Sequence, residues 1–134
     1  MNTTELIEMT KQTYSAFGRG DIPSILQGLD ENVVWTVPGP PEIVAASGVF
    51  RGVQGVASFF SRIGETMKFD VFDPQDYVGE GDTVVALGRA AGTIVQTGKP
   101  FDFNWAMVFT YANGKLTVFR EYFDTAHLIE ASTN

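Results

Sequence analysis

The sequence predicts an α+β fold, with three N-terminal helices packed on one face of a curved, mostly antiparallel sheet and a short closing helix. Helical spacing of apolar residues dominates the first half of the chain, and alternation of apolar residues dominates the second half. Between two alternating segments, Asn113-Gly114 is the commonest sequence signal for a tight hairpin turn. Helices followed by a run of antiparallel strands are typical of a layered α+β domain.

Three helices are expected before the main run of strands. Asn2 and Glu5 match a capping box that opens the first helix, which ends at the Gly-Arg-Gly sequence of residues 18–20. Asp21 is expected to cap a short second helix. An apolar stripe at helical spacing predicts the third helix over residues 53–67.

The remaining segments are expected to form strands and one closing helix. The first strand is β-branched and aromatic, and it stops at a proline-rich loop because proline cannot donate to a sheet ladder. The sequence has no repeat, linker or charge block, so residues 1–134 are expected to form a single domain. The expected strands cover residues 33–37, 47–51, 68–80, 83–96, 101–112 and 115–124, and the closing helix covers residues 125–131.

Composition and charge argue against several kinds of partner. The net charge is −7 and basic residues are scattered singly, which argues against nucleic acid and against an anionic membrane surface. The N-terminus does not resemble a signal peptide and no apolar run approaches a membrane span, so the cytoplasm is the expected compartment. With no cysteine, a lone histidine and no phosphate-binding loop, we expect neither a metal site nor a cofactor.

The last hairpin is expected to divide its side chains between two faces of the sheet. With Asn113 and Gly114 in the turn, Ala112 faces Lys115, and cross-strand partners share a face. One face then carries Phe101, Phe103, Trp105, Met107, Phe109 and Tyr111, with Leu116, Val118, Arg120, Tyr122 and Asp124. The other carries Asp102, Asn104, Ala106, Val108 and Thr110, with Thr117, Phe119, Glu121 and Phe123. Glu121 among apolar neighbours is the best lead to function.

Three motifs resemble the SnoaL-like branch of the NTF2-like superfamily, which includes polyketide cyclases, ketosteroid isomerases and limonene-epoxide hydrolases. The motifs are GVFRG at residues 48–52, EGDTVV at residues 80–85, and NGK with REYFD at residues 113–115 and 120–124. The resemblance covers essentially the whole chain. It implies a cone-shaped α+β fold, an apolar pocket between helices and concave sheet, and a homodimer.

The catalytic residues of these relatives are matched only in part. The isomerase base falls at Val37 and its second acid at Ala106, so steroid isomerisation by that mechanism is not expected. The arginine of the epoxide hydrolases matches Arg89 and one of their acids matches Glu121, but their second acid is missing. The acid near the end of the last cyclase strand corresponds to either Glu121 or Asp124.

We expect Glu121 and Arg89 to carry the chemistry of an internal pocket. A carboxyl with apolar walls has a raised pKa and can donate or accept a proton. The alternative is a buried Glu121–Arg89 ion pair kept for structure. The other expected pocket residues are Tyr14, Trp35, Val37, Asn104, Ala106, Phe119, Phe123 and Asp124.

The expected ligand is a compact apolar molecule of polyketide, terpenoid or steroid-like type, and the expected activity is cofactor-independent acid–base chemistry. The alternatives are a binding or vestigial domain without turnover and an epoxide hydrolase-like enzyme. For Asp124 the alternative is capping the closing helix, and His127 is expected to be a surface residue or a lid contact. The outer sheet face is expected to meet a second subunit through Trp105, Met107 and Tyr122.

Overall fold

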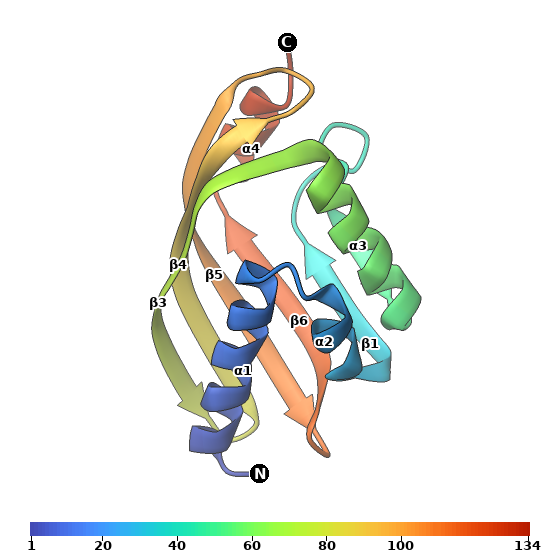
Figure 1. Cartoon of the computed structure of the whole chain (residues 1–134), viewed down its shortest axis with the longest axis vertical. Coiled ribbons are helices and arrows are strands. Elements are labelled where there is room, and N and C mark those ends of the chain that lie inside the picture. The colour runs from blue at the N-terminus through green and yellow to red at the C-terminus, as the bar shows by residue number, and fades with distance from the viewer.

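The computed structural model describes residues 1–134 as a curved sheet with helices over its concave side (Figure 1), which confirms the predicted α+β class. The helices are α1 (Thr3–Gly18), α2 (Ile22–Gln27), α3 (Gly52–Thr66) and α4 (Thr125–Ala131). The strands are β1 (Leu29–Val37), β2 (Gly48–Arg51), β3 (Met67–Glu80), β4 (Thr83–Ile94), β5 (Pro100–Ala112) and β6 (Lys115–Phe123).

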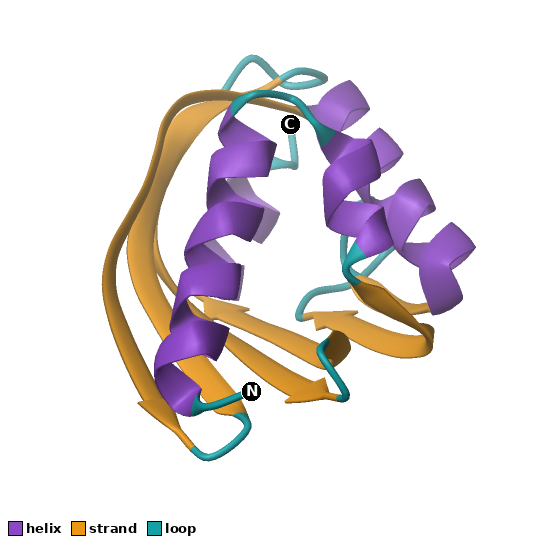
Figure 2. Ribbon diagram, turned by 60° about the horizontal axis from the view of Figure 1, so that its bottom comes forward, coloured by secondary structure: helices purple, strands orange, loops and turns teal.

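The six strands form one sheet in the order β2-β1-β6-β5-β4-β3. Neighbours run antiparallel except β1 and β6, which are parallel. Helix α1 packs against β3 and β4, while α3 packs against β1 and β2. The two helices therefore cover opposite halves of the concave face (Figure 2).

The predicted caps fix where the first helices begin. The side chain of Asn2 accepts from the backbone N–H of Glu5 at 2.8 Å, and Glu5 accepts in return from the N–H of Asn2 at 3.1 Å. This confirms the capping box, which satisfies two donors that a helix start leaves free. Asp21 likewise accepts from the N–H of Ser24 at the start of α2. None of these helices is long and apolar enough to cross a membrane.

Strand β3 carries two irregularities that turn neighbouring rings toward the helices. Its register with β4 shifts between Phe69 and Val71, and again between Pro74 and Asp76. Each shift inserts one extra residue, so Phe69 and Phe72 face the same side although they are three positions apart. Because β3 is also an edge strand, β4 is its only strand neighbour, and α1 packs over this aromatic segment.

The last hairpin contains a β-bulge that the sequence analysis missed. Thr110 pairs with Val118, whereas Tyr111 pairs with Leu116, so Thr117 is an extra residue on β6. The Thr117 hydroxyl donates to the carbonyl oxygen of Thr110 at 3.0 Å. This bond satisfies an acceptor that the interrupted ladder would otherwise leave free.

The bulge exchanges the faces of the residues that follow it. Glu121 is the direct cross-strand partner of Met107 and shares its face with Trp105. The prediction that Glu121 lies beside Ala106 and Val108, opposite Trp105 and Met107, is therefore wrong. The physical reason is the period of two along a strand, since one extra residue moves every later side chain to the other face.

The concave face is also the hydrophobic core. Twenty-four buried apolar residues form one cluster between helices and sheet. The sheet is closely approached at Gly88 of β4, where a Cβ would clash with the ring of Trp105 and the carbonyl oxygen of Asp73. The absence of a side chain there lets the indole of Trp105 lie flat on β4.

Candidate functional site

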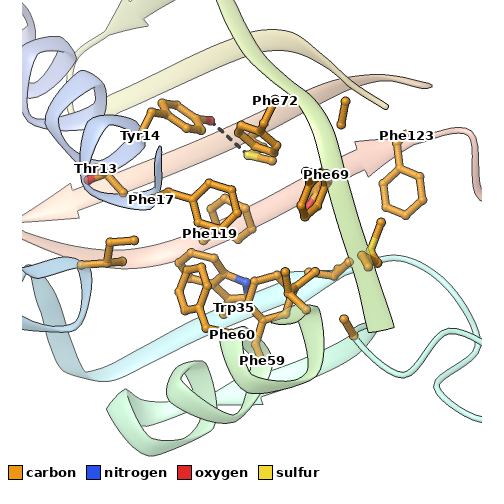
Figure 3. Close-up of a pocket in the computed structure, with 18 of the residues that line it drawn as sticks. Thr13, Tyr14, Phe17, Trp35, Phe59, Phe60, Phe69, Phe72, Phe119 and Phe123 are labelled. Atoms are coloured by element: carbon orange, nitrogen blue, oxygen red, sulfur yellow. Dashed lines mark hydrogen bonds between the residues drawn. The ribbon is translucent and has the colours of Figure 1, made fainter. Parts of the chain in front are cut away.

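A cavity lies between the helices and the concave face of the sheet (Figure 3). Of its 22 lining residues, 20 are hydrophobic. The centres of water-sized molecules can occupy about 80 Å³ of it, whereas one water needs roughly 10–15 Å³ by that measure. The cavity therefore has room for a small apolar group or a few waters, and its walls favour the apolar group.

Aromatic rings supply most of the walls. The indole of Trp35 on β1 stacks on the ring of Phe119 on β6, with ring centres 3.7 Å apart. Phe59 and Phe60 of α3 pack around the same indole, with ring centres 5.4 and 5.6 Å from it. These neighbours hold the rings in place, so the cavity presents flat, rigid surfaces to a ligand.

Glu121 is the one ionisable carboxyl in the cavity lining. It reaches this position from β6, opposite Met107 of β5. No side chain or backbone group hydrogen-bonds its carboxyl, and the residue keeps a partly accessible surface although it lies deep in the protein. Burial among apolar groups raises the pKa of Glu121 to about 8. The carboxyl is thus mainly protonated at neutral pH and is free to contact a ligand.

Tyr14 brings a second polar group to the same space from α1. Its hydroxyl donates to the sulfur of Met107 at 3.0 Å, a weak acceptor (Figure 3). Burial raises the pKa of Tyr14, and the nearby charge of Glu121 raises it further. The phenol therefore remains a neutral donor, and a ligand oxygen would be a better partner for it than the thioether.

Two indole N–H groups of the core have no acceptor. The Nε1 atoms of Trp35 and Trp105 are both buried and unpaired. A buried donor without a partner costs free energy, so such groups are uncommon in native proteins. Trp35 belongs to the cavity lining, and its N–H adds to the unsatisfied polar groups around the cavity.

The polar groups of the cavity permit only a few kinds of chemistry. It combines a mainly protonated carboxyl, a neutral phenol and apolar walls, which suits the binding of a ring and the movement of one proton. No group of three or more His, Cys, Asp or Glu side chains is placed to hold a metal ion.

Six of the residues expected in the pocket line this cavity. They come from α1, β1 and β6, and are Tyr14, Trp35, Val37, Phe119, Glu121 and Phe123. Asn104 and Ala106 do not, because they alternate with the inward residues of β5 and face the convex side. Their assignment to the pocket is wrong, and its cause is the Thr117 bulge.

Arg89 lies on the convex side as well. Its guanidinium donates to both carboxylate oxygens of Asp102, at 2.9 and 2.8 Å, and its side chain is 42% exposed. The expected proximity of Arg89 to Glu121 is therefore wrong, as is the buried ion pair between them. A carboxylate on the neighbouring strand satisfies Arg89 outside the cavity.

Asp124 and His127 belong to the end of the chain. Asp124 accepts from the backbone N–H of His127 at 3.1 Å and caps α4. This is the capping alternative, and Asp124 is absent from the cavity lining. The Nε2 atom of His127 accepts from the N–H of Asp102 at 3.0 Å, which ties α4 to the first residues of β5.

Several lining residues escaped the sequence analysis. Met107, Phe103 and Phe109 line the cavity but had been placed on the opposite face from Glu121. The available signal in the sequence was that these apolar residues of β5 alternate with polar ones, which indicates that they face the core. Phe69 and Phe72 also line it, and their spacing of three gave no strand-like pattern because of the β3 bulge.

Helices over a concave sheet, with an apolar cavity between the two layers, define an NTF2-like α+β cone. The chain belongs to the SnoaL-like domain family, whose model matches residues 10–119. This match confirms the predicted family, and it ends two residues before Glu121.

Relatives agree with this assignment over most of the chain. An NTF2-like protein of Burkholderia xenovorans superposes with a TM-score of 0.90 at 29% identity and covers 99% of each chain. The structure of TerC co-crystallised with polyporic acid has a TM-score of 0.80 at 25% identity, covering 95% of this chain and 97% of TerC. An uncharacterised protein of Mycobacterium tuberculosis is 29% identical over 122 residues, 87% of either chain.

Proposed function

We propose that this SnoaL-like protein binds a compact, mostly apolar molecule of polyketide, terpenoid or steroid-like type in its cavity. There it performs cofactor-independent acid–base chemistry of the isomerase or cyclase type through Glu121. The observation that carries the proposal is a carboxyl without a protein partner, facing an apolar cavity and mainly protonated at neutral pH.

The proposed reaction needs only one group that both gives and takes a proton. Protonated Glu121 donates its proton to one atom of the bound molecule, and the resulting carboxylate removes a proton from another atom. The ligand keeps its number of hydrogens, and Glu121 returns to its starting state. The hydroxyl of Tyr14 donates a hydrogen bond to a ligand oxygen and orients the molecule for this exchange.

The shape of the cavity and one relative support the proposed ligand class. Flat aromatic walls such as the Trp35–Phe119 stack suit a planar ring system. TerC, at 25% identity, has been crystallised with polyporic acid. The free space of about 80 Å³ is smaller than the apolar cavity of roughly 150 Å³ that admits benzene, so the walls must shift somewhat around a larger ligand.

A non-catalytic binding domain is the second candidate. The positions that correspond to the isomerase acids hold Val37 and Ala106, so Glu121 has no second carboxyl to share a two-step proton transfer. An epoxide hydrolase-like reaction is the weakest alternative, because Arg89 bonds Asp102 on the other side of the sheet.

The decisive experiment compares Glu121→Gln with the wild type on a panel of enolisable ketones, polyketide esters and epoxides. If Glu121 transfers the proton, turnover falls roughly 10²- to 10⁴-fold, while binding of the same compounds changes little. Asp102→Asn is the matched control, since it neutralises a carboxyl on the convex face. Equal turnover in the wild type and Glu121→Gln removes Glu121 from the mechanism, and binding without any turnover favours the binding domain.

The proposed homodimer uses the convex face, with a corrected set of residues. Trp105 and Met107 are buried in the core and cannot meet a partner. Leu87, Ala106 and Tyr122 instead form one row across β4, β5 and β6, with Leu87 40% and Tyr122 51% exposed. A solution mass of two chains that falls to one chain in Tyr122→Glu supports this interface, and a wild-type monomer at micromolar concentration contradicts it.

A further inference from the structure

A surface groove runs between α1 and β3, next to the cavity. Ten residues line it: Lys11, Tyr14, Ser15, Phe17, Gly18, Phe69, Asp70, Phe72, Pro74 and Tyr77. Four of them, Tyr14, Phe17, Phe69 and Phe72, also line the cavity. We call these four side chains the ring wall, because one layer of rings separates groove from cavity.

The rings of this wall contact one another. Phe72 has its ring centre 4.9 Å from that of Phe17, 5.5 Å from that of Phe69 and 6.1 Å from that of Tyr14. All four residues are half-buried. They are supported on one side by α1 and on the other by the bulged edge strand β3, which has no strand beyond it. A change of rotamer in these side chains would join the groove to the cavity, because no other layer separates the two.

The opposite end of the cavity is closed. Val44 and Ala46, from the loop between β1 and β2, line it and are 7% and 3% exposed. Leu128 of α4 also lines it and is 3% exposed. The inward residues of that loop therefore form a closed wall of the cavity. Access therefore lies on the side of α1, α3 and β3, where the half-buried lining residues gather.

The groove differs from the cavity in polarity. Five of its ten residues are hydrophobic, compared with 20 of 22 in the cavity. Lys11, Ser15 and Asp70 supply an ammonium group, a hydroxyl and a carboxylate. The charge of Lys11 is already engaged, since its Nζ lies 3.5 Å from Glu8 and 5.3 Å from the centre of the Tyr77 ring. The charges of Lys11 and Asp70 are opposite, so the groove suits an uncharged hydrogen-bonding group.

We propose that the α1–β3 groove is the entrance to the cavity and a second subsite for the same ligand. The ligand is then amphiphilic: its ring end lies in the cavity, and an uncharged polar end, such as a hydroxyl-bearing chain, lies in the groove near Ser15 and Asp70. This assignment rests on the proposed function only in taking the cavity as the ligand site, and it does not depend on catalysis by Glu121.

The entrance can be tested by blocking the groove. The chain has no cysteine, so Ser15→Cys carries the only thiol and can be labelled with a bulky maleimide. The probe is 2-phenoxyethanol, and its binding is followed by stopped-flow tryptophan fluorescence, to which Trp35 and Trp105 both contribute. Labelling at Ser15 should slow association roughly tenfold or more. Gln12→Cys, exposed on the same helix but outside the groove, is the matched control and should show unchanged rates.

The ligand class is tested with three compounds that share one ring. Ethoxybenzene lacks the hydroxyl of 2-phenoxyethanol, and phenoxyacetate carries a carboxylate in its place. The hydroxyl should tighten binding roughly three- to tenfold, the value of one hydrogen bond, and this preference should disappear in a Ser15→Ala, Asp70→Ala double variant. Phe72→Ala should accelerate association, whereas Ile63→Ala, in the cavity but outside the groove, should not.

Three results overturn the proposal. The first is an association rate that labelling at Ser15 leaves unchanged. The second is equal or tighter binding of ethoxybenzene or phenoxyacetate compared with 2-phenoxyethanol, and the third is no binding of any of the three compounds. Because these measurements record binding and not turnover, they give the same answer in Glu121→Gln, which separates this proposal from the catalytic one.

Discussion

Two carboxyls of the last hairpin, Glu121 and Asp102, lie on opposite faces of the sheet and behave in opposite ways. Glu121 faces an apolar cavity without a partner, and burial raises its pKa to about 8. Asp102 lies on the convex face, where hydrogen bonds from Arg89 lower its pKa. The pKa of a carboxyl in this hairpin is therefore determined mainly by the face of the sheet on which it lies.

The two carboxyls also differ in whether they are available to a ligand. The Arg89–Asp102 pair is satisfied and exposed, so it has nothing left to offer a ligand. Glu121 is unsatisfied, and its protonated form is favoured because the apolar surroundings solvate a charged carboxylate poorly. The following experiments either remove this difference or isolate its cause, in order of decreasing expected effect.

The largest effect is expected in the pH dependence of stability. The pKa of Glu121 is about 8 in the folded protein and 4.5 as an ordinary glutamate. Between these values the folded state binds more protons than the unfolded state, so the free energy of unfolding falls as pH rises from about 5 to about 8. Glu121→Gln should remove a destabilisation of roughly 3–5 kcal/mol at alkaline pH, measured by denaturant unfolding at pH 5 and pH 9.

The control for this titration is Asp102→Asn. It should leave the decline between pH 5 and pH 9 in place, because the lowered pKa of Asp102 lies below this window. A wild-type protein whose stability does not fall toward alkaline pH contradicts the buried, unpaired state of Glu121.

The next effect tests the phenol beside Glu121. Tyr14→Phe removes the hydroxyl and keeps the ring, which stacks on Trp105 at 5.5 Å. If that hydroxyl orients the ligand for the proton exchange, turnover should fall roughly 10²-fold. The thermal midpoint should hardly move, because the bond lost is the weak one to Met107. Unchanged turnover would limit Tyr14 to a packing role.

A smaller effect is expected when Glu121 receives the kind of partner that Asp102 has. Met107→Lys places an ammonium group directly across the strand pair from Glu121. The ion pair should lower the pKa of Glu121 by roughly 1–3, observed by NMR titration of carboxyl-labelled glutamate. Ala106→Lys places the same charge on the convex face and should leave the pKa of Glu121 unchanged.

The smallest effect is expected from removing the partner of Asp102. Arg89→Gln should let the pKa of Asp102 return toward its ordinary value, while turnover and the free energy of unfolding stay nearly unchanged, since exposed ion pairs add little stability. The pKa of Asp102, the turnover and the free energy of unfolding are measured by NMR titration, activity assays and denaturant unfolding, respectively. A loss of turnover comparable to that of Glu121→Gln would reinstate Arg89 as part of the site.

Local sequence signals were sufficient for most of the fold. The capping box at Asn2, the cap at Asp21 and the turn at Asn113-Gly114 involve only neighbouring residues, and each is present in the structure. The closing helix over residues 125–131 also matches α4. Such features are predictable because their hydrogen bonds join residues close in sequence.

The site was less predictable because it depends on register. Trp35, Phe119 and Glu121 were placed in the pocket from their apolar surroundings, and they line it. Asn104, Ala106 and Arg89 were misplaced because nothing in the sequence around Thr117 marks an extra residue. Register across strands is set by the whole sheet, including the parallel pairing of β6 with β1, which no local pattern encodes.

The bulge at Thr117 also bears on how such a protein changes over evolution. Deleting this one residue would keep the present strand pairs, whereas one residue inserted between Val118 and Phe119 and paired in the ladder would move Phe119 and Glu121 to the convex face and bring Arg120 and Tyr122 inward. A single codon gained in this strand thus alters more of the cavity than any point mutation. Among descendants of this fold, insertions in the last strand are therefore a direct route to new activities on an unchanged framework.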